Sequence, residues 1–499
     1  MTSQRKRLSE ATAIPDTVNN YVGGEWVDPT GDEGQAVVNP ATTDDLARVG
    51  FSTVEDVDEA VQAANEAFVE WRRTPAAERV QYVFDLKREL EDRTEELAHA
   101  LTMEHGKNLD EARGEIQRGI ENVDVATGIP NMLREGSGNV EDVARDIDET
   151  AVRQPLGVFT AITPFNFPAM IPLWFLPYAV ATGNTFILKP SEKVPLSSQI
   201  IFEAVEAANF PDGVVNLVNG GVDTVNALLE HGDIEGVSFV GSTPIARHIY
   251  ETAAEHGKRV QAQGGAKNYA VVTDHAELDA AVPNLIGSVY GNAGQRCLAN
   301  DVVVGVGDVY DDLYDRLLHA VDDLTVGNGL DEETDIAPLI TAESRERVTD
   351  MIDNAVDEGA ELVVDGRDFE HPEYPEGNFM GPTLLADVTG DMEIAQAEIF
   401  GPVLCLAHLD TLDDAIELVN GTNYGNASSI YTENGAEARQ YRYEVDAGNI
   451  GINVGVCAPM GFFHFGGTKD SFFGDLHAQG EDAVNFYTDK TIEITRWYS

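Results

Sequence analysis

Apolar residues in the first part of the chain recur every three or four positions, which is the spacing of an amphipathic helix. Between residues 54 and 71 this pattern runs through Val57, Val61, Ala64 and Phe68. We therefore predict a helix over these residues, with one face packed on a core.

Two more helical patterns follow, over residues 76–103 and 111–123. Gly106 lies between them and indicates a helix end, because glycine adopts the left-handed conformation of a helix C-cap without steric cost.

From residue 157 onward the pattern changes to short apolar runs separated by helical stretches. The runs lie at residues 157–162, 184–189, 214–218 and 236–240. Strands that alternate with helices form parallel sheets covered by helices, and this repeat is typical of a dinucleotide-binding domain. A second block of the same kind spans residues 267–461, so the predicted fold class is α/β.

Two segments fit neither block, the acidic residues 139–154 and the tail 480–499. The tail alternates polar and apolar side chains over residues 491–497, which predicts a strand. Both segments could be surface strands of a monomer or an arm between subunits. The predicted division is a first domain of residues 1–138 and 155–266, a second domain of residues 267–461, and the arm.

The composition adds an extreme charge, with 87 Asp and Glu against 32 Lys and Arg and a net charge of −55. Such a surface repels nucleic acid and anionic lipid, which excludes both as partners. At 43% hydrophobic residues, the chain is too apolar for an acidic disordered protein. Because 1 M salt screens charges beyond about 3 Å, we interpret the charge as adaptation to a halophilic cytosol. An ordinary acidic protein is the alternative.

Cysteine usage and hydropathy indicate a soluble, cytoplasmic protein. Cys297, Cys405 and Cys457 give no disulfide framework and suit a reducing compartment. Residues 1–17 are polar and lack the apolar core of a signal peptide. The longest apolar stretch, residues 165–181, contains three prolines and is too short to span a membrane.

The sequence GQRC at residues 294–297 is the first candidate for chemistry. Only a thiolate is nucleophilic, and the permanent charge of Arg296 favours that form of Cys297. Arg296 can also hold a planar carboxylate at two points. The motif therefore suggests a covalent nucleophile beside a contact for an acidic substrate, although most cysteines are simply buried apolar residues.

Three further motifs strengthen this interpretation: TPFNFP (163–168), FVGST (239–243) and EIFGP (398–402). Together with GQRC, their order and separations resemble the aldehyde dehydrogenase superfamily, and the resemblance covers nearly the whole chain. Within the superfamily the chain is most similar to the CoA-acylating methylmalonate-semialdehyde dehydrogenase branch. The segments that indicate the branch are FNFPAMIP (165–172), GGAKN (264–268) and SFFGD (471–475).

The resemblance implies a mechanism in which Cys297 attacks an aldehyde. Asn166 and the backbone N–H of Cys297 would stabilise the oxyanion that forms, each such donor being worth about 2.7–4 kcal/mol. Hydride transfer to NAD then leaves an acyl thioester on Cys297. Without the resemblance, Asn166 would be interpreted as a turn residue before Pro168.

The cofactor is expected at the ends of the first domain's strands, where open α/β sheets bind ligands. Ser242 precedes a helix beginning near Pro244, whose N-terminus would hold a phosphate. The resemblance assigns the adenosine ribose to Lys189, Glu192 and Lys193. The acid favours NAD over NADP, although both lysines would tolerate a phosphate. The resemblance places the remaining cofactor contacts at Thr163, Phe165, Gly264 and Glu398.

The group that releases the acyl chain distinguishes the branches. Hydrolytic relatives carry a glutamate base before Leu-Gly-Gly, and the stretch VQAQGG (260–265) matched to it places Ala262 there. Alanine cannot activate water, whereas a thiol with a pKa of about 8.5 needs less help. We therefore predict thiolysis, with coenzyme A as co-substrate. A carboxylate approaching from elsewhere would instead allow hydrolysis.

An acidic substrate needs cations, and the family places arginines at the positions of Arg296 and Arg118. Either arginine could instead simply pair with acidic residues on the surface. This alternative has more weight for Arg118 than for Arg296. The branch oxidises methylmalonate or malonate semialdehyde to propionyl- or acetyl-CoA and loses the carboxylate as carbon dioxide or bicarbonate, so the resemblance implies this reaction here. It also implies a homodimer or homotetramer joined through the arm.

Two departures from the family pattern leave the length and branching of the substrate open. Thr468 replaces a common tryptophan and Gly455 replaces an expected proline. His464 lies between aromatic residues and is interpreted as packing, and no Cys/His spacing predicts a metal site. The alternatives are a hydrolytic NAD-dependent aldehyde dehydrogenase and a non-enzymatic protein that kept the fold.

Overall fold

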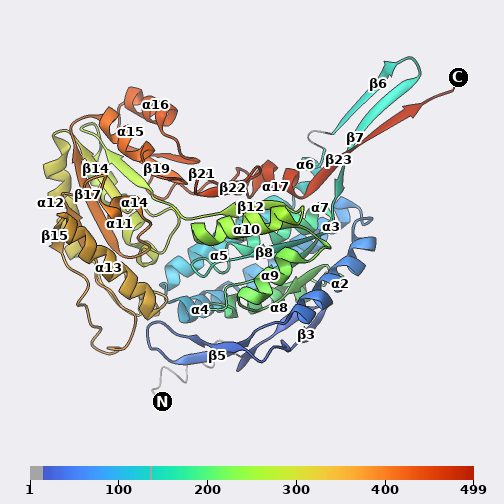
Figure 1. Ribbon diagram of the computed structural model, residues 1–499, viewed down its shortest axis with the longest axis horizontal. Coiled ribbons are helices and arrows are strands. Elements are labelled where there is room, and N and C mark those ends of the chain that lie inside the picture. Colours follow the sequence, from blue (N-terminus) through green and yellow to red (C-terminus); the bar gives the residue numbers. More distant parts are fainter. Residues whose placement is uncertain (1–14, 135–136, 499) are drawn as a thin grey trace.

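The computed structural model describes residues 15–134 and 137–498. Residues 1–14 and 135–136 of the first predicted domain, and Ser499 of the predicted arm, lie outside the described residues. Figure 1 shows two α/β parts side by side, with a long hairpin that projects from the first part and carries the C-terminal strand.

The periodic segment at residues 54–71 forms helix α2 (Val54–Trp71), which the Thr53 side chain caps through the Asp56 N–H. The helical pattern at residues 76–103 forms two helices, α3 (Ala76–Asp92) and α4 (Thr94–His105), which are separated at Arg93. Gly106 ends α4 in the left-handed conformation, as predicted, with φ of 99°.

The first part is built on a mostly parallel sheet with helices on both faces. Its central strands take the order β12-β11-β8-β9-β10, and β22, β2 and β3 continue it antiparallel at the two edges. The strands are β2 (Asn20–Val22), β3 (Glu25–Val27), β8 (Val158–Ile162), β9 (Thr185–Lys189), β10 (Val215–Leu217), β11 (Ile234–Val240), β12 (Arg259–Gln263) and β22 (Phe472–Gly474).

Two apolar clusters cover the two faces of this sheet. One contains α2, α9 (Val222–Glu230) and α10 (Thr243–Glu255). The other contains α3, α4, α5, α7 and α8. The bounds of the last three helices are Leu109–Ala126, Leu176–Thr182 and Leu196–Ala207.

The second part is a sheet in the order β15-β16-β17-β14-β13-β19-β20, parallel except at β15. Its strands are β13 (Tyr269–Val272), β14 (Val302–Val306), β15 (Glu361–Val364), β16 (Thr383–Ala386), β17 (Val403–Leu409), β19 (Ala427–Tyr431) and β20 (Asn449–Ile452). Its principal helices are α11 (Leu278–Tyr290), α12 (Val309–Asp322), α13 (Ala342–Glu358), α15 (Leu412–Asn420) and α16 (Gly435–Glu444).

The projecting hairpin consists of β6 (Gly138–Ala144) and β7 (Ile147–Pro155), with β23 (Thr488–Arg496) paired antiparallel to β7. Residues 480–486, which were predicted with the arm, instead form helix α17 (Gly480–Phe486), which contacts α7.

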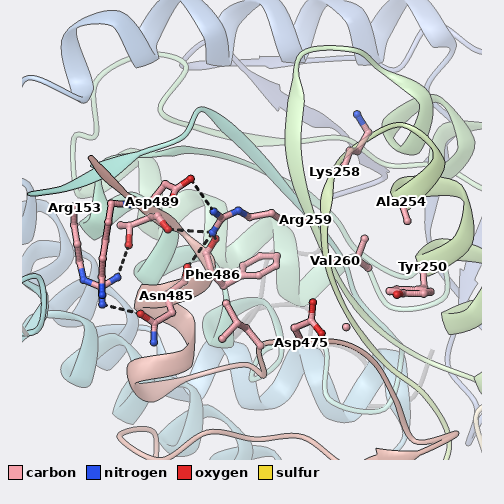
Figure 2. Close-up of a pocket in the computed structure, with 14 residues that line it drawn as sticks. Arg153, Tyr250, Ala254, Lys258, Arg259, Val260, Asp475, Asn485, Phe486 and Asp489 are labelled. Atoms are coloured by element: carbon pink, nitrogen blue, oxygen red, sulfur yellow. Dashed lines mark hydrogen bonds and ion pairs between the residues drawn. The ribbon is translucent and has the colours of Figure 1, made fainter. Parts of the chain in front are cut away.

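Arg259 holds the junction between α17 and β23. Its Nη1 donates to the carbonyls of Asn485, Phe486 and Thr488 at 3.0–3.1 Å, and Arg153 from β7 reaches the Asn485 and Thr488 side chains. Figure 2 shows both guanidinium groups pointing into this junction. The base of the arm is therefore fixed by two arginines from different strands.

No helix among the described residues is long and apolar enough to cross a membrane.

Candidate active site

A cavity of about 280 Å³ lies where the loops of the two parts meet. Cys297 and Arg296 line it from the loop after the short 3-10 helix η2 (Gly291–Gly294), and Arg118 lines it from α5. Trp174 and Phe465 supply much of its apolar wall, with ring centroids 4.5 Å apart. The structure thus brings the predicted nucleophile and both predicted substrate arginines to one cavity.

An unusual backbone turn presents the nucleophile. Asn292, Ala293 and Gly294 all have positive φ, at 55°, 52° and 72°. A Cβ added at Gly294 would lie 2.0 Å from the Gly401 carbonyl oxygen, so only glycine fits there. This close approach explains the glycine of GQRC, whereas the glycine of EIFGP leaves room for Val348, whose Cγ2 would lie 2.6 Å from a Cβ at Gly401.

Two asparagine side chains fix the Cys297 backbone. The Nδ2 atoms of Asn268 and Asn426 donate to the Cys297 carbonyl at 2.9 and 2.7 Å. These residues lie next to the starts of β13 and β19, so the second sheet positions the nucleophile.

Asn166 follows β8 and is buried. Its Nδ2 donates to the Gln295 carbonyl at 3.1 Å, two residues before Cys297. The amide therefore lies beside the nucleophile loop, as expected for a donor to an oxyanion at Cys297.

A buried ion pair that the sequence analysis missed supports the Asn166 loop. The Lys107 Nζ lies 2.5 Å from a Glu115 oxygen and donates to the Asn166 carbonyl at 2.7 Å, and neither side chain is exposed. Glu115 also accepts hydrogen bonds from the N–H groups of Ala169 and Met170 at 2.8 and 3.1 Å. The pair therefore holds the loop at both ends. Lys107 and Glu115 lie eight residues apart, but the loop that they hold is more than 50 residues away, so no local sequence signal could have found the arrangement.

Burial dominates the electrostatics of the nucleophile. Burial and the nearby Glu398 raise the pKa of the Cys297 thiol to about 12, whereas Arg296 acts in the opposite direction. The predicted preference for thiolate beside Arg296 is therefore right in direction but too small to prevail. Burial, with repulsion from Asp301, likewise raises the pKa of Glu398 to about 8.

The two substrate arginines are engaged to different extents. The Arg118 terminal nitrogens contact the Glu121 carboxylate, the carbonyls of Ala458 and Pro459, and the Met460 sulfur at 2.8–3.2 Å. These contacts leave its Nε without a partner among the described residues.

Arg296 has more unpaired N–H donors than Arg118. It bonds the Glu111 carboxylate at 2.8 Å and the Gly287 carbonyl at 3.1 Å, so three of the five N–H groups of its guanidinium have no partner among the residues that the structure describes. Glu111 lines the cavity beside it, and this acid was also missed.

The predicted ribose contacts lie at the end of β9. Lys189 and Glu192 form an ion pair at 3.0 Å. The Lys193 Nζ lies 5.6 Å above the Phe165 ring, whose edge meets Phe400.

The predicted phosphate and nicotinamide contacts lie near the start of α10. Ser242 is the N-cap of α10, and its side chain makes no capping hydrogen bond. A Cβ at Gly264 would lie 2.7 Å from the Asp470 carbonyl oxygen, and one at Gly265 would lie 2.9 Å from a Glu398 oxygen. The buried Thr163 hydroxyl has no partner within the described part of the chain. The uncapped helix start fits a phosphate, whereas the contacts with Asp470 and Glu398 account for the two glycines within the protein itself.

The strand that precedes these glycines corrects one assignment. Ala262 points into the apolar cluster on the α10 face of the sheet. Its neighbour Gln263 points to the opposite face and donates to the Phe465 carbonyl at 3.4 Å. Because strand side chains alternate between faces, Gln263 is the residue on the cavity side. It carries no carboxylate either, so the absence of a base on this strand still holds.

The histidines have packing contacts. His464 stacks on His477 with ring centroids 5.0 Å apart, and the buried His105 stacks on Phe165 at 6.0 Å. Within residues 15–134 and 137–498, no group of three or more His, Cys, Asp or Glu side chains could hold a metal ion.

Comparisons with known proteins agree with this geometry. The model of the aldehyde dehydrogenase family matches residues 26–492. Malonate-semialdehyde dehydrogenase 2 of Geobacillus kaustophilus is 47% identical, covering 96% of this chain and 99% of its own. A malonate-semialdehyde dehydrogenase of Halalkalibacterium halodurans is 46% identical, covering 97% and 99%.

Solved structures give the same relationship. A putative methylmalonate-semialdehyde dehydrogenase from Sinorhizobium meliloti, complexed with NAD, has a TM-score of 0.95 at 41% identity, covering 97% of this chain and 98% of its own. The methylmalonate-semialdehyde dehydrogenase of Oceanimonas doudoroffii has a TM-score of 0.95 at 42% identity, covering 97% and 99%.

Proposed function

The chain belongs to the aldehyde dehydrogenase family, and we propose that it oxidises malonate or methylmalonate semialdehyde and transfers the acyl group to coenzyme A. The observation that supports this best is the cavity that places Cys297 beside Arg296 and Arg118. A nucleophile and two cations in one cavity suit an aldehyde that bears a carboxylate.

The chain's own residues perform the carbon chemistry. The Cys297 sulfur attacks the aldehyde carbon, and the carbonyl oxygen becomes an oxyanion within reach of the Asn166 amide and the Cys297 N–H. Collapse of this adduct expels a hydride and leaves an acyl thioester on Cys297. Burial raises the pKa of the Cys297 thiol, so the thiol has to lose its proton to the solvent or to a base before or during the attack.

NAD, when bound, supplies the hydride acceptor. Lys189 and Glu192 would hold its adenosine ribose, assisted by Lys193 and Phe165. Ser242 and Gly264 would receive the pyrophosphate, and Glu398 and Thr163 would lie on the nicotinamide side.

Coenzyme A completes the cycle. Its thiol attacks the thioester carbon, so that acyl-CoA leaves and Cys297 regains its proton. The C–C bond to the carboxylate breaks and releases carbon dioxide, and the α-carbon left behind takes a proton from water; hydration of the carbon dioxide gives bicarbonate. Malonate semialdehyde therefore yields acetyl-CoA, and methylmalonate semialdehyde yields propionyl-CoA. In the described cavity lining the carboxylates are Glu111 and Glu115, and each is paired with a cation. Both Glu115 oxygens are engaged. The Glu111 Oε2 has no partner among the described residues, so Glu111 is the lining carboxylate that hydrolysis would have to use.

The arm and the net charge suggest the oligomeric state of the protein and the kind of cytosol in which it works. We propose a homodimer or homotetramer joined through β6, β7 and β23, whose Ile492 and Ile494 are 56% and 66% exposed. The net charge of −55 suits a halophilic cytosol, because molar salt screens the repulsion between acidic side chains.

The test is NADH formation from the two semialdehydes in molar salt, with and without coenzyme A. Sustained turnover only with coenzyme A, yielding acetyl- or propionyl-CoA, would support the proposal. Equal turnover without coenzyme A, yielding a free acid, would show that water is activated and would refute thiolysis.

A further inference from the structure

Gln479 lines the cavity that contains Cys297, on the side formed by the C-terminal segment. It immediately precedes α17 and is only 2% exposed. The proposed mechanism assigns this buried amide no role.

Within the described part of the chain, the Gln479 side chain has no hydrogen-bond partner. Its Oε1 is buried and unpartnered, and no hydrogen bond from its Nε2 reaches any residue in the described ranges. Buried amides normally find partners. Because Oε1 can only accept, the atom that can serve a ligand acceptor in the cavity is Nε2, whose N–H donors have no partner among the described residues.

The Gln479 backbone is strained as well. Its φ of 69° and ψ of 170° lie in a region that is essentially limited to glycine. Gly480 follows with φ of 55°. Such strain persists where the surrounding structure imposes it, and it clusters at ligand-binding sites.

The donors around the cavity explain what Gln479 could bind. A carboxylate offers about four acceptor positions. Arg118 has committed both terminal nitrogens to Glu121 and to the 458–460 segment, and Arg296 shares its charge with Glu111. Among the described residues, three N–H groups of Arg296 and the Nε of Arg118 stay open. A substrate carboxylate can therefore bind these cations, and Gln479 would add a neutral donor beside them.

We propose that Gln479 is a specificity residue whose amide donates to the carboxylate of the semialdehyde, alongside Arg296 and Arg118. This inference rests on the proposed function and adds to it a contact that selects acidic aldehydes over neutral ones. The interaction involves no proton transfer, so Gln479 affects recognition and not the chemical step.

The experiment compares malonate semialdehyde with propanal, which has a methyl group in place of the carboxylate. In Gln479→Glu, a carboxylate of the same shape faces the substrate. KM for malonate semialdehyde should rise by at least about tenfold, because a hydrogen bond to a charged group is lost and repulsion is added. KM for propanal should change by less than about threefold. Gln479→Met, which removes the donor without adding charge, should show a smaller shift in the same direction.

The matched control is Gln261→Met. Gln261 is also buried with an unpartnered Oε1, but its Nε2 bonds Ser238 and it does not line the cavity. It should leave the ratio of the two KM values unchanged. A Gln479→Glu variant that affects both aldehydes equally, or neither, would overturn the inference while wild-type turnover of the semialdehyde still supports the proposed function. A wild-type enzyme inactive on semialdehydes would instead refute the function itself.

Discussion

Replacing Lys107 with methionine should damage stability and catalysis by two separable routes. The Lys107 ammonium lies 2.5 Å from Glu115, 2.7 Å from the Asn166 carbonyl and 4.3 Å above the Phe167 ring. Lys107→Met leaves the Glu115 charge buried without a partner, which costs about 3–5 kcal/mol. It also removes one of the bonds that hold the Asn166 loop.

The double variant Lys107→Met/Glu115→Gln separates the two effects. No buried charge remains, and the glutamine oxygen can still accept from the Ala169 and Met170 N–H groups. Most of the lost stability should therefore return, because exchanging both charges of a buried pair is often nearly neutral. The bond to the Asn166 carbonyl stays absent, so catalysis should not recover.

The assay combines urea unfolding in molar salt with single-turnover NADH formation. Asn166→Ala sets the scale, since loss of an oxyanion donor lowers kcat by about 10²–10³. The single-turnover rate of both Lys107 variants should fall at least about tenfold, and by no more than the rate of Asn166→Ala. A double variant with recovered stability and an undiminished single-turnover rate would show that Lys107 does not orient Asn166.

Three further outcomes follow from the site and the arm. Gly294→Ala should destabilise the protein by about 2–5 kcal/mol, because its Cβ would lie 2.0 Å from the Gly401 oxygen at a φ of 72°; a variant with wild-type unfolding would contradict the close contact. Alkylation of Cys297 by iodoacetamide without cofactor should accelerate about tenfold per pH unit from pH 7 to 9, since burial raises the thiol pKa to about 12. Glu398→Gln should accelerate it chiefly above pH 8, where the Glu398 carboxyl, whose pKa burial raises to about 8, is ionised; a wild-type rate that levels off below pH 9 would disprove the raised pKa of Cys297. Arg259→Met should lower the free energy of unfolding by about 1.5–3 kcal/mol, measured with heat or urea, because its hydrogen bonds at the base of the arm are lost. It should also weaken assembly through the arm, measured by sedimentation. An unchanged free energy of unfolding and an unchanged oligomeric state would show that this junction needs no arginine.

Local sequence patterns predicted the elements whose cause is local. Helix α2 follows from the apolar spacing with a Thr53 cap, and the left-handed end of α4 follows from Gly106. The break at Arg93 was missed because the helical pattern runs through it without glycine or proline.

The sequence predicted the site residues that belong to recognisable motifs, and it did not predict the others. Cys297, Arg296 and Arg118, which the motifs indicate, line one cavity. The roles of Lys107, Glu115 and Gln479 depend on contacts with residues far away in the chain, which no motif predicts. The Ala262 assignment failed for a different reason: a shift of one residue along a strand moves a side chain to the other face. The fold shows that Gln263 is the residue on the cavity side.

The most direct test of the account is the stoichiometry of NADH released by micromolar enzyme with malonate semialdehyde and NAD in the absence of coenzyme A. If an acyl thioester on Cys297 waits for a thiol, a rapid burst of one NADH per active site should be followed by near arrest. Adding coenzyme A should then restart turnover, and Cys297→Ser should show no burst. Continuous NADH production without coenzyme A, at the rate seen with it, would contradict the account.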